Sequence, residues 1–402
     1  MKVLQINSYE GVGSTGRIAS GIQQIVRENG HEFLNCYGRK SNKTKDSIKI
    51  GDNIDIYKHV IATRVFDRHG LASKKPTQNL IKQIISLNPD VIHLQNIHGY
   101  YLNYKILFKF LKEYKKPIVW SLHDCWSFTG HCSHFEYVDC NRFETGCFNC
   151  PEKSSYPKSI VWDNSKKNYL IKKETFTNVE NLTIVTASDW LDRQLEKSFL
   201  KNYPREKIQT GIDLKKFRPI KSDIKTNLSL NNKFVILGVA SVWGSRKGLG
   251  EFIKLSKVIK EDEIIVLVGV NEKEKSNLPK NIIGVSKTES IEELAKIYSM
   301  ADVFANPTLE DTFPTTNLEA QACGTPVITY NTGGSPESVP EGCGYTVDKS
   351  NISSLYEKIS DIKTNSKQKY FSHCLENARK YDMYIKYQDY YLLYQKLLGG
   401  IK

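Results

Sequence analysis

No stretch of this 402-residue sequence holds the run of about 20 apolar residues that a membrane-spanning helix requires. The apolar run at residues 3–6 is too short for a secretion signal, and we interpret it as a buried first strand. Low-complexity segments and short-period repeats are also lacking, and the composition, with 40% hydrophobic and 25% charged residues, is that of a globular chain. We therefore expect a soluble, cytoplasmic protein.

The charge is unbalanced. The net charge is +13, a balance that favours polyanions such as nucleic acid, anionic lipid head groups or phosphorylated small molecules. A lysine-rich, simply solvated surface explains the same number equally well. Charge alone therefore does not choose between these classes of partner.

Strand and helix patterns alternate along the chain, which predicts parallel sheets covered by helices. Short apolar runs of the first half lie at residues 3–6, 33–37, 91–94, 118–122 and 182–186. A second series lies at residues 234–237, 264–268, 282–285, 303–305 and 327–330. A chain of this length exceeds the size of one hydrophobic core.

The polar interval at residues 218–233 has the composition of a linker. We therefore predict two doubly wound, Rossmann-like α/β domains, at residues 1–217 and 218–380, with a ligand in the cleft between them. Residues 381–402 are expected to form a carboxyl-terminal helix that packs back on the first domain.

The segment at residues 309–328 is typical of a strand end, a polar loop, a helix and the next strand. Asp311 in the loop and Glu319 on the helix are suited to accept hydrogen bonds from vicinal hydroxyls of a sugar or ribose. Thr315 and Thr316 begin the helix, where hydroxyls and amides receive phosphate or sugar oxygens. An ordinary capped helix is the alternative interpretation.

A second polar segment, residues 238–249, also follows a strand and opens a helix. It carries Arg246 and Lys247. A guanidinium fork and an ammonium point charge suit a diphosphate leaving group on which negative charge develops. The alternative is a basic turn on the surface.

Two further candidates lie at predicted strand ends. His123 follows the run at 118–122, and Gly16 belongs to the glycine-rich stretch at 11–17 after the first strand. Glycines let backbone amides approach a phosphate closely. The alternatives are a buried structural histidine and an ordinary glycine turn.

Together these segments resemble the retaining family 4 glycosyltransferases of the GT-B fold, over nearly the whole chain. That family carries two acidic residues in this register with a Phe between them, matched here by Asp311, Phe313 and Glu319. The resemblance implies that Asp311 contacts the donor sugar and Glu319 the ribose. Asp311 stands where Glu is usual and Pro314 where Gly is usual, so Glu310 is an alternative for the sugar contact.

The resemblance also assigns roles to the other candidates. It implies that Lys247 binds the diphosphate and that Arg246 takes over from an arginine whose usual position is Ser241 here. His123 would hydrogen-bond the donor sugar, and Gly16 would lie across the cleft from the donor. The family likeness places Thr288 near the nucleobase.

An Asp-x-Asp motif, the metal-holding signature of the other common glycosyltransferase fold, is absent. We therefore expect no cofactor to be required for catalysis. The expected donor is a UDP- or GDP-sugar.

Residues 67–74, 92–101 and 126–132 resemble the colanic-acid and capsular polysaccharide branch of the family. That branch builds surface polysaccharide on a lipid carrier. The likeness implies a glycan or lipid-linked acceptor, an acceptor side shaped by His98, Tyr100 and Trp126, and peripheral attachment to the inner face of the plasma membrane.

The nine cysteines are unevenly placed. A cysteine-rich loop at residues 125–151 holds Cys132, Cys140, Cys147 and Cys150, of which the last two have Cys-x-x-Cys spacing. Four thiolates suit a closed, structural zinc site. Reduced free thiols are the alternative, and His131 and His134 are alternative ligands.

Two rival functions remain open at this point. The first is a sugar epimerase or phosphorylase on the same scaffold, which would need catalytic acids or a cofactor lysine of its own. The second is a basic, zinc-bearing nucleic-acid-binding protein, which predicts salt-dependent binding. Because the chemical segments all fall at predicted strand ends, we expect a transferase that binds no nucleic acid.

Overall fold

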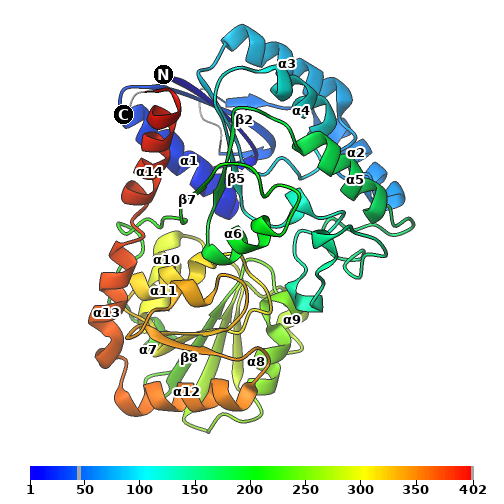
Figure 1. Ribbon diagram of the computed structural model, residues 1–402. Coiled ribbons are helices and arrows are strands. Elements are labelled where there is room, and N and C mark those ends of the chain that lie inside the picture. The colour runs from blue at the N-terminus through cyan, green and yellow to red at the C-terminus, as the bar shows by residue number, and fades with distance from the viewer. Residues whose placement is uncertain (43–46, 400–402) are drawn as a thin grey trace. The chain divides into compact units, whose positions relative to one another are not determined.

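The computed structural model describes residues 1–42 and 47–399, which form two compact units (Figure 1). The first unit comprises Met1–Gln209 and the chain from Lys386 onward, and the second comprises Thr210–Ile385. Residues 210–217 belong to the second unit because Ile212 exchanges backbone hydrogen bonds with Tyr381 and Met383. In the part of the chain that the structure describes, no helix has the length and apolar character to span a bilayer.

The first unit is built on a seven-stranded parallel sheet of order β3-β2-β1-β4-β5-β6-β7. Its strands are β1 (Lys2–Glu10), β2 (Glu32–Ser41), β3 (Ser47–Lys49), β4 (Val91–Leu94), β5 (Ile118–Leu122), β6 (Leu182–Thr186) and β7 (Arg205–Lys207). Its helices are α1 (Gly13–Glu28), α2 (Asn53–Phe66), α3 (Lys74–Leu87), α4 (Tyr104–Glu113), α5 (Ser165–Phe176) and α6 (Asp189–Glu196). The order reverses between β1 and β4, which is the switch point of a doubly wound fold.

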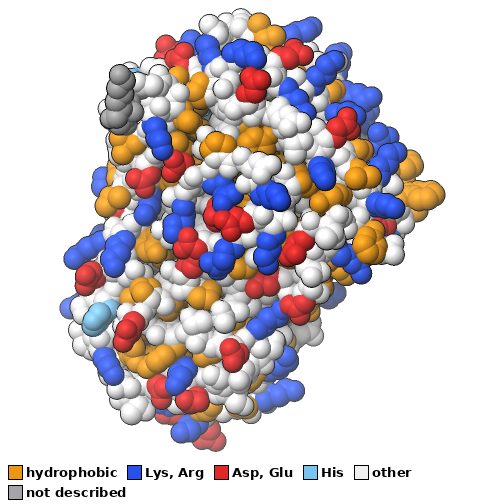
Figure 2. Space-filling model, viewed as in Figure 1, with side chains coloured by type: hydrophobic (Ala, Val, Ile, Leu, Met, Phe, Trp, Pro, Cys, Tyr) orange, Lys and Arg blue, Asp and Glu red, His pale blue; other side chains and the backbone are white. Residues whose placement is uncertain are grey.

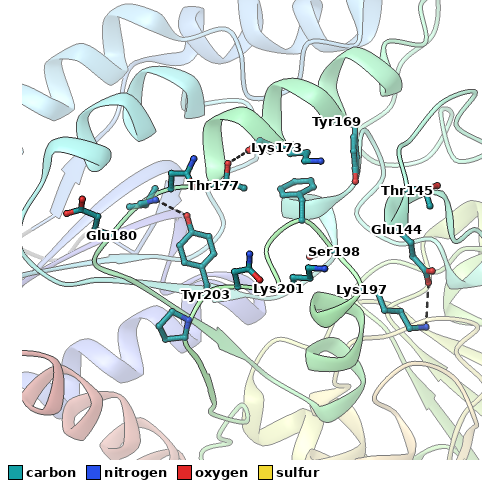
Figure 3. A pocket seen from close by; sticks show the side chains of 15 residues that line it. Glu144, Thr145, Tyr169, Lys173, Thr177, Glu180, Lys197, Ser198, Lys201 and Tyr203 are labelled. Atoms are coloured by element: carbon teal, nitrogen blue, oxygen red, sulfur yellow. Dashed lines mark hydrogen bonds and ion pairs between the residues drawn. The ribbon is translucent and has the colours of Figure 1, made fainter.

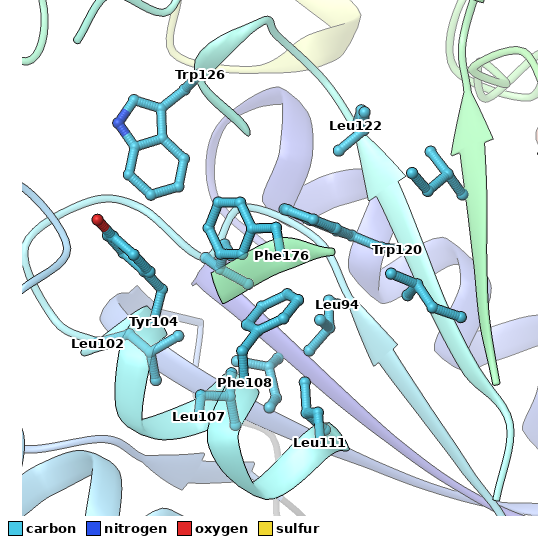
Figure 4. Packing of buried hydrophobic residues seen from close by; sticks show 14 of the residues in the cluster. Leu94, Leu102, Tyr104, Leu107, Phe108, Leu111, Trp120, Leu122, Trp126 and Phe176 are labelled. Carbon is cyan, nitrogen blue, oxygen red and sulfur yellow. The ribbon is translucent and has the colours of Figure 1, made fainter. Parts of the chain in front are cut away.

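Large aromatic side chains fill the core between α4, α5 and the sheet of the first unit (Figure 4). The Phe176 ring lies 4.6 Å from Phe108 and 5.0 Å from Trp120, centroid to centroid. Each such side chain contributes about 1.5–3 kcal/mol through burial. This core holds the ends of β4 and β5 in place.

The carboxyl-terminal helix α14 (Met383–Leu397) presents a stripe of tyrosines to the first unit. The Tyr390 hydroxyl lies 3.0 Å from Ser121 Oγ, and the Tyr394 hydroxyl lies 2.7 Å from His93 Nδ1. All four side chains are buried. The helix therefore joins the first unit through buried polar contacts as well as apolar packing.

The second unit has a six-stranded parallel sheet of order β10-β9-β8-β11-β12-β13. Its strands are β8 (Phe234–Val239), β9 (Glu263–Val268), β10 (Ile282–Val285), β11 (Val303–Asn306), β12 (Val327–Tyr330) and β13 (Gly344–Val347). Its helices are α7 (Ile224–Asn227), α8 (Leu249–Leu255), α9 (Glu272–Lys275), α10 (Ile291–Met300), α11 (Thr315–Ala322), α12 (Ile352–Asn365) and α13 (Gln368–Arg379). Both units thus have the predicted Rossmann-like architecture.

Candidate functional site

The switch point of the second unit lies between β8 and β11, where ligands bind in doubly wound folds. A short 3-10 helix, Ser245–Lys247, follows β8, and a polar loop follows β11. Gly248 ends the short helix with φ +79°, and a Cβ there would stand 2.2 Å from the Pro307 carbonyl oxygen. Only glycine allows this close approach, which brings the two segments together.

Lys247 and Asp311 meet at this switch point. Lys247 Nζ lies 2.5 Å from Asp311 Oδ2, and the two side chains are 28% and 14% exposed. Arg246 lies beside them: its Nη1 donates to the Glu310 carbonyl at 3.3 Å, and its own carbonyl accepts from Leu309 N at 2.8 Å. Two cations and one carboxylate therefore reach the surface at the carboxyl ends of β8 and β11.

The structure distinguishes Asp311 from its neighbour Glu310. Glu310 is buried, at 3% exposure, whereas the Asp311 carboxylate contacts Lys247. The Asp311 carbonyl accepts from Gly334 N at 3.0 Å, and Gly333 packs so closely that a Cβ would stand 1.8 Å from that oxygen. This packing fixes the backbone so that Asp311, not Glu310, presents its carboxylate next to Lys247.

Glu319 lies on α11 with its side chain buried at 5% exposure. The hydroxyl of the fully buried Tyr298 donates to Glu319 Oε2 at 3.0 Å and so fixes the carboxylate. Phe313 is also buried and packs on Tyr381 at 5.8 Å between centroids. The buried Phe313 ring therefore stabilises the loop that follows β11.

Thr315 and Thr316 form the first turn of α11 and are half-buried. The N-cap residue is Pro314, whose side chain has no oxygen to accept a hydrogen bond from the first amides. Thr288 is half-buried in the loop after the edge strand β10. It lies two strands from β8, at the far edge of the same sheet.

In the first unit, His123 follows β5 and Gln95 follows β4. His123 Nε2 lies 3.0 Å from Gln95 Oε1, and Gln95 Nε2 donates to Gln5 Oε1 at 2.5 Å. This network assigns the proton to Nε2 and leaves Nδ1 as an acceptor. Burial lowers the pKa of His123 to about 4, although nearby Asp124 opposes the shift. The imidazole is therefore neutral at pH 7.

Asp124, His98 and Tyr156 form a series of polar contacts beside His123. Asp124 Oδ2 lies 3.0 Å from His98 Nε2, and His98 Nδ1 lies 2.9 Å from the Tyr156 hydroxyl. Burial opposes ionisation of Asp124, but the adjacent His98 and the Trp126 amide outweigh it and hold its pKa well below the usual value. Asp124 is therefore a carboxylate that orients His98.

The structure brings Tyr100 to this series but corrects the expectation for Trp126. The Tyr100 ring lies 4.7 Å from His69, which in turn lies 6.1 Å from His98. Trp126 is only 1% exposed, and Lys172 Nζ lies 3.6 Å above its ring. Trp126 is thus a core residue that supports the His98 region from behind and does not line an open surface.

Gly16 lies in the first turn of α1 and is buried. Its carbonyl accepts from Gly11 N at 3.0 Å, and an added Cβ would stand 3.2 Å from both Gly11 N and Tyr9 Cβ. The absence of a side chain at Gly16 therefore permits the tight turn between β1 and α1.

The predicted zinc ligands Cys132, Cys140, Cys147 and Cys150 are free thiols in the loop at 125–151. Cys132 and Cys150 are close enough for a thiol hydrogen bond, which together with burial raises the pKa of Cys132. Cys147 Sγ instead accepts from Gly130 N at 3.2 Å. Across residues 1–42 and 47–399, no group of three or more His, Cys, Asp or Glu is placed to hold a metal ion. Structural zinc therefore stays a prediction.

A separate cavity of about 650 Å³ lies in the first unit between α5 and the loop after α6 (Figure 3). Its rim carries Lys173, Lys197 and Lys201, and Lys197 pairs with Glu144 at 3.5 Å. The residues that line it include none of the candidates predicted from the sequence.

Sequence reasoning missed the residues that hold the candidates in place. Gln95, Tyr156 and Tyr298 each contact a predicted site residue through one hydrogen bond. Only Gln95 carried a signal, as a polar side chain directly after a buried strand. The other two partners are distant in sequence from the residues they orient.

Comparison with known proteins finds a family model that matches part of the chain, and solved structures that share its fold. The family described as "Glycosyl transferases group 1" matches residues 220–381. WcaC of Escherichia coli K12, assigned to colanic acid biosynthesis, is 28% identical over 173 residues, 39% of this chain and 41% of WcaC. An N,N'-diacetylbacillosaminyl-diphospho-undecaprenol α-1,3-N-acetylgalactosaminyltransferase of Campylobacter jejuni is 27% identical over 204 residues, 48% of this chain and 54% of that protein. The chain thus spans about half the length of these relatives.

Among solved structures, sucrose-phosphate synthase from Thermosynechococcus elongatus superposes with a TM-score of 0.73 at 16% identity, covering both chains completely. Anabaena Alr3699/HepE in complex with UDP gives a TM-score of 0.66 at 14% identity, again over both complete chains. These similarities establish the GT-B fold.

Proposed function

We propose that this chain is a group 1 glycosyltransferase that transfers a sugar, with retention, from a nucleotide-sugar donor to a glycan or lipid-linked saccharide acceptor. The match of residues 220–381 to that family supports the proposal. The observation that carries the proposal is the meeting of Lys247, Arg246 and Asp311 at the switch point of the second unit. Two cations beside a carboxylate suit a sugar diphosphate, which presents negative charge next to hydroxyl donors.

In the proposed reaction, the bond between the anomeric carbon and the diphosphate oxygen breaks as the acceptor oxygen bonds to the same face of that carbon. The departing phosphate oxygen takes the acceptor's proton, so no strong base is needed. Lys247 and Arg246 stabilise the charge that develops on the diphosphate. We propose no catalytic cofactor, since these cations and the amides of the first turn of α11 supply that stabilisation.

The remaining roles follow from the contacts of each side chain. Glu319, held by Tyr298, would accept hydrogen bonds from the ribose hydroxyls. Asp311 would bind the donor sugar, and the Nδ1 of neutral His123 would accept a further sugar hydroxyl. Thr288 would lie near the nucleobase, and Thr315 and Thr316 would bind oxygens of the donor.

The proposed acceptor and the proposed biosynthetic role are supported by the named activities of the relatives. WcaC is assigned to colanic acid biosynthesis, and the Campylobacter enzyme is named for an undecaprenol diphosphate-linked sugar. We propose a role in surface polysaccharide synthesis on a lipid-linked acceptor, with His98 and Tyr100 on the acceptor side. A cytoplasmic protein attached peripherally to the membrane fits this role.

A transfer assay tests the proposal. Wild type, Lys247→Ala and the exposed control Lys257→Ala are incubated with UDP- and GDP-hexoses and undecaprenyl-diphosphate-linked sugars, and proton NMR follows the anomeric configuration. Retained configuration in a transferred sugar, lost in Lys247→Ala only, supports the proposal. Epimerised donor, sugar phosphate or inverted product would contradict it.

A further inference from the structure

Helix α2 buries polar side chains and exposes apolar ones, which is the opposite of an ordinary surface helix. Its inward residues His59 and Thr63 are polar and fully buried, whereas Ile54, Tyr57 and Ile61 are 63%, 67% and 43% exposed. These three apolar residues follow helical spacing and share one outward face. A surface helix normally buries its apolar face and exposes its polar one. The outward face of α2 is therefore apolar and exposed.

The orientation of α2 is fixed by hydrogen bonds on its inward side. His59 uses both ring nitrogens: Nδ1 lies 2.8 Å from Ser73 Oγ, and Nε2 accepts from Gly70 N at 2.9 Å. Thr63 Oγ1 donates to the His59 carbonyl at 2.9 Å. Rotating the helix to bury its isoleucines would break these hydrogen bonds and leave buried polar groups unpaired, which is unfavourable. The apolar face is therefore held outward.

A second apolar segment joins α2 at its carboxyl-terminal end. Ile160, Val161 and Trp162 are 60%, 58% and 57% exposed. Backbone hydrogen bonds fix this loop to the helix, from Ile160 N to the Arg64 carbonyl at 2.7 Å and from Trp162 N to the Val65 carbonyl at 3.3 Å. We call the exposed apolar residues of both segments the α2 surface; they are Ile54, Tyr57, Ile61, Phe66, Ile160, Val161 and Trp162.

Basic side chains border the α2 surface. The exposed ones are Lys58 and Arg64 on α2, Lys158 before the loop, and Lys166 and Lys167 at the start of α5. Asp163 is also exposed, but its oxygens accept from Cys150 N at 2.6 Å and Ser165 N at 2.9 Å. Figure 2 shows orange apolar and blue basic side chains interleaved on the right-hand edge of the molecule, where Figure 1 draws α2 and α5.

We propose that the α2 surface docks on an anionic phospholipid bilayer, with its isoleucines and Trp162 at the acyl boundary and its lysines and Arg64 at the phosphates. Apolar residues with an interfacial tryptophan and a basic border are the combination that binds anionic membranes without spanning them. Each basic residue near such a surface strengthens the electrostatic attraction to the anionic lipids.

The inward side of α2 connects this surface to the acceptor side. The His59 ring contacts Tyr100 at 6.1 Å and His69 at 5.9 Å, centroid to centroid. One helix thus carries the outward apolar face and supports the residues proposed to face the acceptor. The inference rests on the proposed function for the identity of a lipid-linked acceptor, but docking itself requires no transferase activity.

Co-sedimentation with vesicles tests the proposal. The full chain is mixed with vesicles of phosphatidylcholine alone or of equal parts phosphatidylcholine and phosphatidylglycerol, without any sugar nucleotide. We expect binding to the anionic vesicles that falls about tenfold or more in Ile54→Asp/Trp162→Asp. The matched control is Ile85→Asp, because Ile85 on α3 is equally exposed, at 63%, and lies outside the α2 surface. Unchanged melting temperatures establish that the variants fold.

A conservative variant supplies a second readout. Trp162 fluorescence should shift to shorter wavelength with anionic vesicles, and Trp162→Phe should lose that shift while still sedimenting with them. Equal binding by the double variant and wild type, or no binding to either vesicle, would overturn the proposal. So would dimerisation in sedimentation velocity that the double variant abolishes, since the α2 surface would then bind a second copy. If the chain transfers sugar but does not bind vesicles, the docking proposal is contradicted and the proposed function is not.

Discussion

Lys247 Nζ lies 2.5 Å from Asp311 Oδ2 at the switch point between β8 and β11. The ion pair joins residues 64 positions apart in sequence. In the proposed reaction, the ammonium group would bind the diphosphate and the carboxylate would bind the adjoining sugar. Before the donor binds, Lys247 and Asp311 compensate each other's charge. The donor would then replace Asp311 as the partner of Lys247, and Lys247 as the partner of Asp311.

Lys247→Ala should lower kcat/KM for sugar transfer by about 100- to 1000-fold, because it removes one cation from the developing diphosphate charge. Lys247→Arg, which keeps the charge, should recover part of the loss. Steady-state kinetics check this. The exposed Lys257→Ala serves as the control, and a Lys247→Ala enzyme within twofold of wild type would contradict the assigned role.

Tyr298→Phe should raise the KM for the donor several-fold with little change in kcat, because Tyr298 positions Glu319 and would not touch the donor. The matched control is Tyr356→Phe, which removes a similar hydrogen bond of 3.1 Å to Glu263. An equal change in both variants would show that Tyr298 acts only on stability.

The free energy of unfolding should fall as the pH drops from 7 to 5. Burial lowers the pKa of His93 to about 3, with His123 adding to the shift. Between that value and about 6.5 the unfolded chain binds the proton and the folded chain does not, so stability rises with pH there. His93 alone contributes about 2 kcal/mol of the loss to pH 5.

Urea unfolding at pH 7 and pH 5 measures this dependence. His93→Gln should have a shallower slope than wild type, whereas the exposed His373→Gln should keep the wild-type slope. A slope unchanged in His93→Gln would show that the buried imidazole does not govern the acid sensitivity.

Lys172→Met should destabilise the first unit by about 2–4 kcal/mol. Lys172 is 1% exposed, and its Nζ donates to the carbonyls of Trp126 at 2.5 Å and Thr129 at 3.0 Å, which the substitution leaves buried and unpaired. Chemical denaturation measures the difference against the exposed neighbour Lys173→Met, which should unfold like wild type. Equal stability of both variants would contradict a structural role for Lys172.

Much of the fold could be predicted because its strands are buried on both faces and appear as continuous apolar runs. The runs at 91–94, 118–122, 182–186, 282–285 and 327–330 are confirmed as β4, β5, β6, β10 and β12. The edge strands β3 and β7 are Ser-Ile-Lys and Arg-Glu-Lys, which carry no such signal. Their pairing is set by neighbours distant in sequence.

The candidate residues after strand ends could be predicted for the same reason, since the carboxyl ends of parallel strands meet at one edge. The burial of individual side chains could not be predicted from the sequence. Trp126 was expected to shape the acceptor side, but it is buried against Lys172 and Phe176, which come from a helix distant in sequence. The exposed apolar face of α2 also escaped prediction, because only the structure shows which side of the helix His59 holds inward.

The most direct test of the central claim is a thermal-shift series with UDP-, GDP-, ADP- and CMP-sugars on wild type and Lys247→Ala. A nucleotide sugar at 100 times its dissociation constant should stabilise the folded chain by about 2.7 kcal/mol. We predict a clear rise in melting temperature with one nucleotide, and loss of that rise in Lys247→Ala but not in Lys257→Ala. No shift with any nucleotide sugar, or a shift that persists in Lys247→Ala, would contradict a donor site at the switch point of the second unit.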